Sequence, residues 1–173
     1  MVTRDDFSAS DSAYKAGAAA LLIAIATIVV AHGFELVGGY RPCPLCLMQR
    51  WAYYAAIPVL FLALVLTTAG QRRLAALAFV AVALAFLGNA GLGIYHAGVE
   101  WAFWPGPDTC AGAPQSLASG PGALLSSLET ANVVRCDRAP WQFLGLSFAG
   151  WNVVLSGIGF AATLKASIAS LAR

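Results

Sequence analysis

Residues 41–71, RPCPLCLMQRWAYYAAIPVLFLALVLTTAGQ, decide how this chain folds. Two cysteines stand shortly before an uncharged, mostly apolar run from Trp51 to Gln71. A helix needs roughly 20 such residues to cross about 30 Å of hydrocarbon. The stretch therefore predicts a membrane-spanning helix with a cysteine pair at its beginning.

Three further runs of similar or greater length lack Asp, Glu, Lys and Arg, and they are Ala16–Phe34, Leu74–Val99 and Ala139–Leu164. A fifth run, Thr109–Leu128, is rich in proline, glycine and serine, so its backbone cannot satisfy itself as a helix in lipid. We predict an all-α membrane protein, a four-transmembrane-helix bundle forming one domain over residues 1–173. The predicted helices cover about 14–34, 45–69, 73–96 and 146–168, with outer loops at 35–44 and 97–145.

The composition supports this fold class and excludes others. Apolar residues make up 60% of the chain and charged residues 10%, whereas an ordinary soluble domain carries about 25% charge. A water-soluble globule is therefore excluded. The net charge of +2 comes without a basic cluster, so no nucleic-acid partner is expected.

The distribution of lysine and arginine predicts the orientation in the membrane. In a four-helix arrangement, one side of the membrane holds six of these residues: Arg4, Lys15, Arg72, Arg73, Lys165 and Arg173. The other side holds four: Arg41, Arg50, Arg135 and Arg138. The positive-inside rule then places both termini in the cytoplasm.

All four cysteines fall on the outer side. Cys43 and Cys46 lie where the first outer loop meets the second helix, and Cys110 and Cys136 lie in the second loop. Thiols on the oxidising side of a membrane are expected to form or exchange disulfides.

The first pair has the spacing of a redox site at a helix start. Pro44 suits the first helical position, so Cys43 is the predicted N-cap and Cys46 lies in the first turn. The positive end of the helix dipole favours the thiolate there. Arg50 follows one turn later on the same face, where a charge close to lipid points to a function, although a snorkelling arginine is the simpler alternative.

The spacing of the cysteines also bears on metal binding, haem attachment and a structural role. Structural zinc disagrees with the spacing of the second pair, whose members have 25 residues between them, so no metal site is predicted. A c-type haem needs histidine after the second cysteine, where Leu47 stands. The second pair could also be a structural disulfide that closes the long loop.

These motifs together resemble one known family. The segment Cys43-Pro-Leu-Cys46-Leu-Met-Gln-Arg50, the loop pair Cys110 and Cys136, and the segment Cys136-Asp-Arg-Ala-Pro-Trp141-Gln-Phe-Leu-Gly145-Leu-Ser are similar to the disulfide bond formation protein B family. The resemblance covers nearly the whole chain.

The resemblance implies a bacterial inner-membrane oxidoreductase that reoxidises a periplasmic, DsbA-like thioredoxin-fold protein and passes two electrons to a membrane quinone, either ubiquinone or menaquinone. It implies that Cys110 meets the partner, with Cys136 as its mate, and that Cys43 exchanges with this loop pair. Cys46 and Arg50 are implied at the quinone, and His96 is a further candidate. The acidic residue that some relatives carry before the arginine is Gln49 here.

Two rival interpretations remain at this point. One is an enzyme like vitamin K epoxide reductase, which reduces a quinone-type substrate for its own sake. The other is a non-enzymatic membrane protein with structural disulfides. A cysteine pair that opens the second helix favours the disulfide bond formation family over the first rival.

Overall fold

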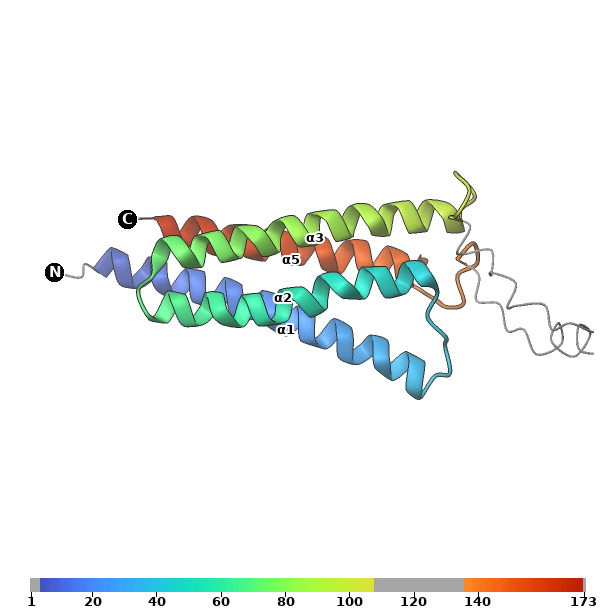
Figure 1. Cartoon of the computed structure of the whole chain (residues 1–173), viewed down its shortest axis with the longest axis horizontal. Coiled ribbons are helices and arrows are strands. Elements are labelled where there is room, and N and C mark those ends of the chain that lie inside the picture. The colour runs from blue at the N-terminus through green and yellow to red at the C-terminus, as the bar shows by residue number, and fades with distance from the viewer. Residues whose placement is uncertain (1–3, 108–135, 173) are drawn as a thin grey trace, which may run out of the picture.

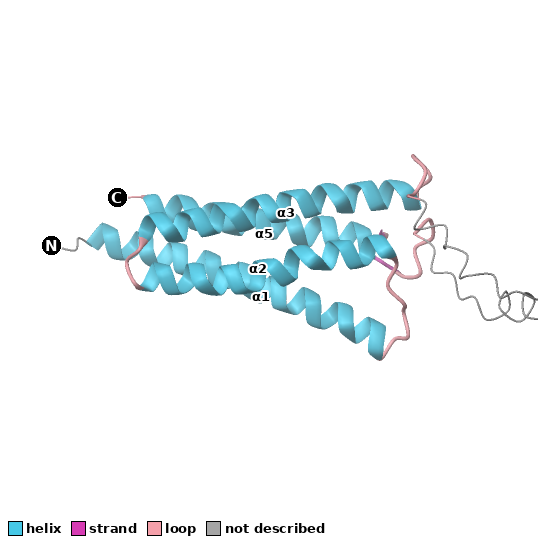
Figure 2. Ribbon diagram, in the orientation of Figure 1, coloured by secondary structure: helices cyan, strands magenta, loops and turns pink. Residues whose placement is uncertain are grey.

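The structure is a computed structural model that describes residues 4–107 and 136–172. Its long helices are α1 (Arg4–Leu36), α2 (Pro44–Thr68), α3 (Arg72–Glu100) and α5 (Phe148–Leu171). All four are long and apolar enough to cross a membrane. The predicted four-helix membrane fold is therefore confirmed, and Figure 2 shows how little of the described chain lies outside helices.

The observed helices differ from the predicted segments mainly at their ends. The segment predicted at 14–34 lies inside α1, because the polar residues ahead of the apolar run continue the helix. The segment predicted at 73–96 lies inside α3, which continues through Glu100 and so puts this carboxyl one turn after His96.

Each helix packs mainly against two neighbours, which makes the bundle four-sided. α3 packs against α2 and α5, and α1 closes the ring by contacting α2 and α5. Both termini and the turn between α2 and α3 lie at one end, called here the terminal end (Figure 1). At the opposite end, called the cysteine end, α1 diverges from the other helices (Figure 1).

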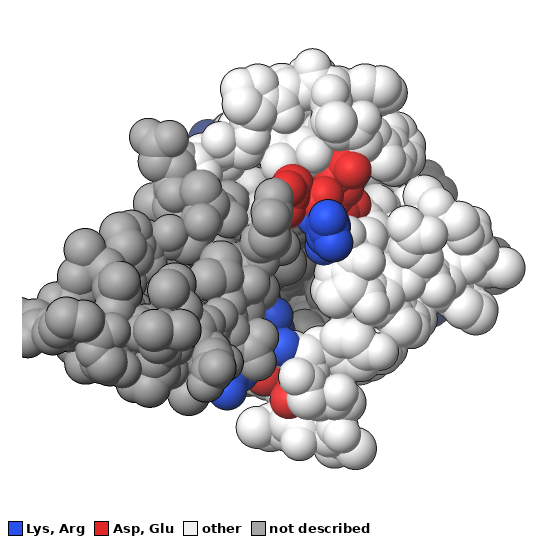
Figure 3. Space-filling model, turned by 90° about the vertical axis from the view of Figure 1, so that its right-hand side faces the viewer, with Lys and Arg blue, Asp and Glu red and all other residues white. Residues whose placement is uncertain are grey.

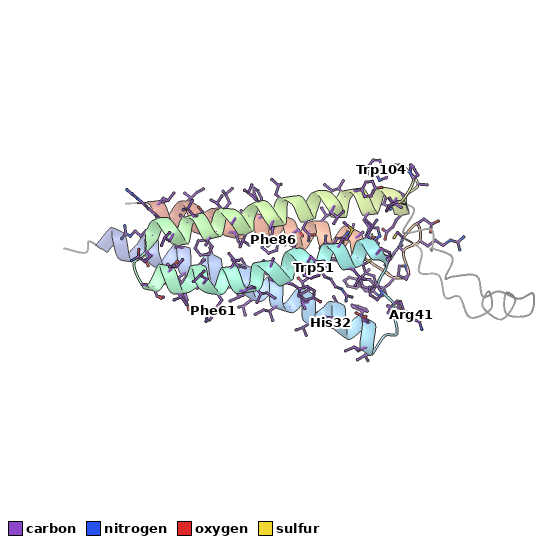
Figure 4. The ribbon with its side chains drawn as sticks, in the orientation of Figure 1. His32, Arg41, Trp51, Phe61, Phe86 and Trp104 are labelled. Atoms are coloured by element: carbon purple, nitrogen blue, oxygen red, sulfur yellow. The ribbon has the colours of Figure 1, made fainter. Side chains whose placement is uncertain are left out.

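Small residues allow close packing at the centre of the bundle and toward the terminal end. A Cβ atom on Gly17 would lie 2.6 Å from the Phe79 ring, and one on Gly159 would lie 2.9 Å from the Phe86 ring. Both phenylalanines are completely buried, and Figure 4 shows Phe86 within the bundle. Lipid is as apolar as leucine, so no hydrophobic force draws membrane helices together. Close packing of a large side chain against a glycine holds them together instead.

A buried polar network joins three helices in the half of the bundle nearer the cysteine end. The Tyr53 hydroxyl of α2 donates to Asn152 Oδ1 at 2.9 Å and lies 3.0 Å from Ser156 Oγ, both on α5. Asn89 of α3 donates to the same two oxygens at 3.1 and 3.0 Å. Because these side chains are buried together, their hydrogen bonds replace water that the bilayer cannot supply.

A short hairpin leads into α5. Strands β1 (Gln142–Phe143) and β2 (Leu146–Ser147) pair antiparallel around Leu144 and Gly145, whose φ angles of 53° and 77° are those of a tight two-residue turn. Ser147 then caps α5, because its hydroxyl accepts from the Gly150 N–H at 3.2 Å. The hairpin is thereby fixed at the start of α5.

The polar network predicts a measurable contribution to stability. Replacing Asn89 by Leu removes the two hydrogen bonds that Asn89 donates to α5, and we expect the free energy of unfolding to fall by about 1 kcal/mol, the usual size for such bonds in membranes. SDS titration of the detergent-solubilised protein measures this. Leu87→Ala, at an exposed site on the same helix, is the control and should change little. An unchanged free energy of unfolding in Asn89→Leu would contradict the prediction.

Candidate active site

The first cysteine pair forms the beginning of α2. Cys43 is the N-cap, Pro44 occupies the first helical position, and the Cys46 backbone N–H donates to Cys43 Sγ at 3.2 Å. This is the predicted local geometry. The two sulfurs lie 2.8 Å apart and share a hydrogen bond, and both cysteines are free thiols. Little movement is needed for the pair to close a disulfide.

Cys43 is strongly activated for ionisation. The pKa of Cys43 is lowered from 9.0 to about 5, first by the hydrogen bond with Cys46 and further by the neighbouring His96, against the opposing effect of burial. A thiolate at this position is the form that attacks disulfides or leaves them.

His96 reaches Cys43 from α3. Its ring is 2% exposed, with Nε2 3.7 Å from Cys43 Sγ and Nδ1 3.1 Å from Gln49 Nε2. Glu100 Oε1 lies 3.9 Å from His96 Nε2, and the Ser147 hydroxyl donates to the same carboxyl group. His96, predicted as a cofactor contact, is thus also a direct neighbour of a reactive sulfur.

The second cysteine pair is represented by Cys136. This residue is buried and disulfide-bonded, and its Sγ lies within 4.8 Å of both Cys43 Sγ and a ring nitrogen of His96. The structure thus brings one sulfur of the predicted loop pair against the first pair. Cys110 lies outside the described residues.

The same three atoms have a spacing that suits a metal ion. The metal ligand from cysteine is the thiolate, however, and a disulfide sulfur is not one. With Cys136 in a disulfide, the ligands left from this group are Cys43 and His96. The arrangement therefore fits sulfur exchange better than metal binding.

Arg50 is held by an acidic partner on α1. Its Nη1 donates to Glu35 Oε2 at 2.6 Å and its Nη2 to the Ala31 carbonyl at 3.4 Å. His32 lies 3.6 Å from the same carboxylate and 2.9 Å from the Tyr54 hydroxyl. A snorkelling arginine would extend to water, whereas this one bridges two helices beside the cysteine pair.

A cavity of about 500 Å³ opens beside the pair, where α1 diverges from the other helices. Cys43, Cys46, Arg50 and His96 line it together with side chains from α1, α5 and the segment leading into α5. Most of its walls are apolar, and its aromatic residues are Phe34, Tyr40, Tyr53, Trp141, Phe143, Phe148 and Trp151. Figure 3 shows charged side chains around a hollow at this end, and Figure 4 shows His32 and Arg41 in this half of the bundle, with Phe61 in the other half.

Sequence reasoning missed several residues of the site. Glu35 and Glu100 were not singled out, although each is a lone acidic residue at the end of an apolar run, which is a usable signal. Gln49 was noted only as a departure from the family pattern, yet it contacts His96. Asn152 also borders the cavity, and nothing in the sequence marks it.

The fold and the site define a multi-pass membrane protein with a cysteine pair arranged for thiol–disulfide exchange. The chain belongs to the disulfide bond formation protein B family: the family model described as "Disulfide bond formation protein DsbB" matches residues 14–166. The resemblance inferred from the motifs is thus confirmed, and the chain has the disulfide oxidoreductase role that this family implies.

Relatives named disulfide bond formation protein B occur in several bacteria. The protein of Aromatoleum aromaticum is 34% identical over 126 residues, which is 67% of this chain and 69% of the relative. That of Albidiferax ferrireducens is 27% identical over 149 residues, covering 79% and 77%. That of Marinobacter nauticus is 30% identical over 144 residues, covering 77% and 79%. No solved structure matches the chain.

The low pKa of Cys43 predicts that the alkylation rate of this cysteine depends little on pH. In the reduced protein, alkylation of Cys43 by iodoacetamide should change little between pH 8 and pH 6, because a group with a pKa of about 5 stays ionised there. Mass spectrometry of the fragment Arg41–Arg50 gives the rate. The Cys43 thiol ionises more easily in the folded state than in the unfolded chain. Its ionisation therefore stabilises the fold fully above pH 9, and this stabilisation is lost as the pH falls toward 5.

The control is the same protein unfolded in SDS. There the alkylation rate of an ordinary thiol should fall about tenfold for each pH unit below its pKa. A fall of that steepness in the folded protein would contradict the assignment.

Proposed function

We infer that this protein is a quinone-dependent thiol oxidase that reoxidises a periplasmic, DsbA-like thioredoxin-fold protein. The observation that carries the proposal is one contact. The disulfide-bonded Cys136 lies within 4.8 Å of Cys43, whose pair-mate Cys46 borders a cavity suited to an electron acceptor. A disulfide, a dithiol and a cavity in this order form a path for two electrons.

The first half of the reaction takes place in the second loop. A thiolate of the reduced partner attacks Cys110 of the Cys110–Cys136 disulfide, and Cys136 leaves with the electron pair of the broken bond. The partner's second thiol then closes the partner's own disulfide and releases Cys110. The partner has lost two electrons, and the loop pair has gained them.

The second half transfers these electrons to the first pair. The Cys136 thiolate attacks Cys43 of the Cys43–Cys46 disulfide, and Cys46 takes the electron pair. Cys110 then attacks Cys136 and releases Cys43 as a thiolate. The free thiols at 43 and 46 and the disulfide at Cys136 are those expected at the end of this step.

The cavity fits a quinone head group. Its volume of about 500 Å³ lies in the range of small-molecule sites, and its walls are largely apolar and aromatic. Cys46, Arg50 and His96 are the proposed contacts, with the Arg50 guanidinium as the charged donor. A bound quinone, ubiquinone or menaquinone, supplies an acceptor for two electrons and two protons.

The chain's own residues prepare this site. The helix start brings Cys46 to the cavity wall, and Glu35 fixes the Arg50 side chain at the same wall. Gln49 and Glu100 orient the His96 ring. The aromatic walls exclude water, which strengthens each of these polar contacts.

We place the protein in the bacterial inner membrane with the cysteine end in the periplasm and both termini in the cytoplasm. Support comes from Arg72 and Arg73, which begin α3 at the same end of the bundle as both termini (Figure 1). Basic residues of short turns favour the cytoplasmic side.

The decisive experiment couples both substrates. The purified protein in detergent is given a short-chain quinone and a reduced periplasmic dithiol protein, and quinone absorbance is followed together with thiol loss. We expect one quinol for each dithiol oxidised, and no quinol with Cys46→Ser. Leu47→Ser, a neighbouring exposed site, is the control and should retain activity.

The result also separates the rivals. Quinone reduction that proceeds with other thiols but not with the dithiol protein would favour an enzyme of the vitamin K epoxide reductase kind. No quinone reduction, with all cysteines inert, would leave a structural role.

Arg50 predicts a specific kinetic defect. Arg50→Gln removes a charged hydrogen-bond donor from the cavity, and we expect the KM for quinone to rise about tenfold, the effect of losing one such bond. Initial-rate kinetics at several quinone concentrations measure it. Arg73→Gln, at the terminal end, is the matched control. An unchanged KM would remove Arg50 from the proposed quinone site.

A further inference from the structure

We propose that His96 is a catalytic residue of the disulfide exchange itself: its Nε2–H donates to Cys43 Sγ and makes the Cys43–Cys46 pair a stronger oxidant. The inference rests on the proposed function for the direction of electron flow. It assigns His96 a task at the sulfur in addition to the cofactor contact suggested by the family resemblance.

Three donors converge on Cys43 Sγ when this sulfur is a thiolate. The Cys46 backbone N–H lies at 3.2 Å, the Cys46 thiol at 2.8 Å and His96 Nε2 at 3.7 Å. The first two belong to the same helix turn as the sulfur, so every Cys-x-x-Cys helix start offers them. The third comes from α3, 53 residues away in the chain, and depends on the tertiary fold.

Gln49 decides which ring nitrogen of His96 carries the proton. Its side-chain amide nitrogen lies 3.1 Å from Nδ1, and an amide nitrogen can only donate. Nδ1 is therefore the acceptor, and the neutral ring carries its hydrogen on Nε2, the atom that faces Cys43. Gln49 is a positioning residue in this arrangement.

Glu100 holds the same ring from the other side. Its carboxyl oxygen lies 3.9 Å from Nε2, and the Ser147 hydroxyl at the start of α5 donates to that carboxyl group. Ser147, the cap of α5, thereby ties the position of Glu100 to the segment that follows Cys136. His96 is fixed by α2, α3 and α5 together.

The chemical effect follows from charge. When another sulfur displaces Cys43 from a disulfide bond, Cys43 Sγ takes the electron pair of the broken bond and becomes a thiolate. A donor that stabilises this thiolate stabilises the reduced pair, so the corresponding disulfide accepts electrons more readily. The Nε2 proton stays on the ring throughout, and no group is lost or gained. The low pKa of Cys43, to which His96 contributes, agrees with this effect.

Other charges face the same cavity, and the test must keep them constant. They are Arg41, Arg50, Arg138 and Glu100, with Arg50 paired to Glu35. Substitution of His96 by a neutral side chain leaves all of them in place.

The test compares two neutral replacements of similar size. Glutamine in His96→Gln can still donate to Cys43, and methionine in His96→Met cannot. Each full-length protein is equilibrated with mixtures of reduced and oxidised glutathione, and mass spectrometry gives the fraction of the 43–46 pair that is oxidised. We expect His96→Met to shift the equilibrium toward the disulfide about tenfold, or about 30 mV, as for one hydrogen bond to a charged group.

Most of this shift should be absent in His96→Gln. Ile94→Met, at an exposed site of the same helix, is the matched control for the methionine and should behave as the wild type. Equal equilibria for the wild type and His96→Met would overturn the proposal, as would equal shifts in His96→Met and His96→Gln.

A second variant leaves His96 in place, so that the proposal can still be tested if the His96 variants do not fold. Gln49→Leu removes the tautomer control, and we expect a smaller shift in the same direction with a steeper pH profile of Cys43 alkylation. No shift there would also count against the proposal. Because the glutathione equilibrium needs neither quinone nor protein partner, failure of the coupled assay and failure of this inference are separate outcomes.

Discussion

The beginning of α2 at Cys43 is the constraint on which the site depends. Pro44 needs no hydrogen-bond acceptor at the first helical position, and the Cys43 sulfur accepts from the first turn, so the chain becomes helical between the two cysteines. The helix start therefore fixes the separation of the sulfurs, directs helix donors at one of them and sets the direction of Gln49 and Arg50. Moving this start by one residue would rotate each later side chain of α2 by about 100°.

The bilayer imposes the second condition, because every polar group that leaves water must find a partner inside the protein. The Tyr53 network meets it in the half of the bundle nearer the cysteine end, and the Arg50–Glu35 pair meets it beside the cavity. Both are made between helices, so satisfying them also fixes how the helices are rotated about their axes. The polar residues thus position the reactive groups even where they touch no sulfur.

Much of the fold could be read from the sequence, because the gaps between charged residues mark the spans and proline marks the start of α2. The arrangement of Cys43, Pro44 and Cys46 follows from local rules alone. The contacts of His96 with Cys43 and Gln49 do not, since they depend on the rotation of α3 relative to α2, which no local pattern encodes. The pairing of Arg50 with Glu35 was missed for the same reason: its two members lie on different helices.

The divergence of α1 has a further consequence for the surrounding lipid. The bundle is closely packed toward the terminal end and hollow toward the cysteine end, so its cross-section is larger in one leaflet than in the other (Figure 1). Beside the cavity, the Arg50–Glu35 ion pair joins the diverging half of α1 to α2. The lipid of that leaflet therefore surrounds the wider end of the bundle, which holds the cavity and in which this ion pair joins α1 to α2.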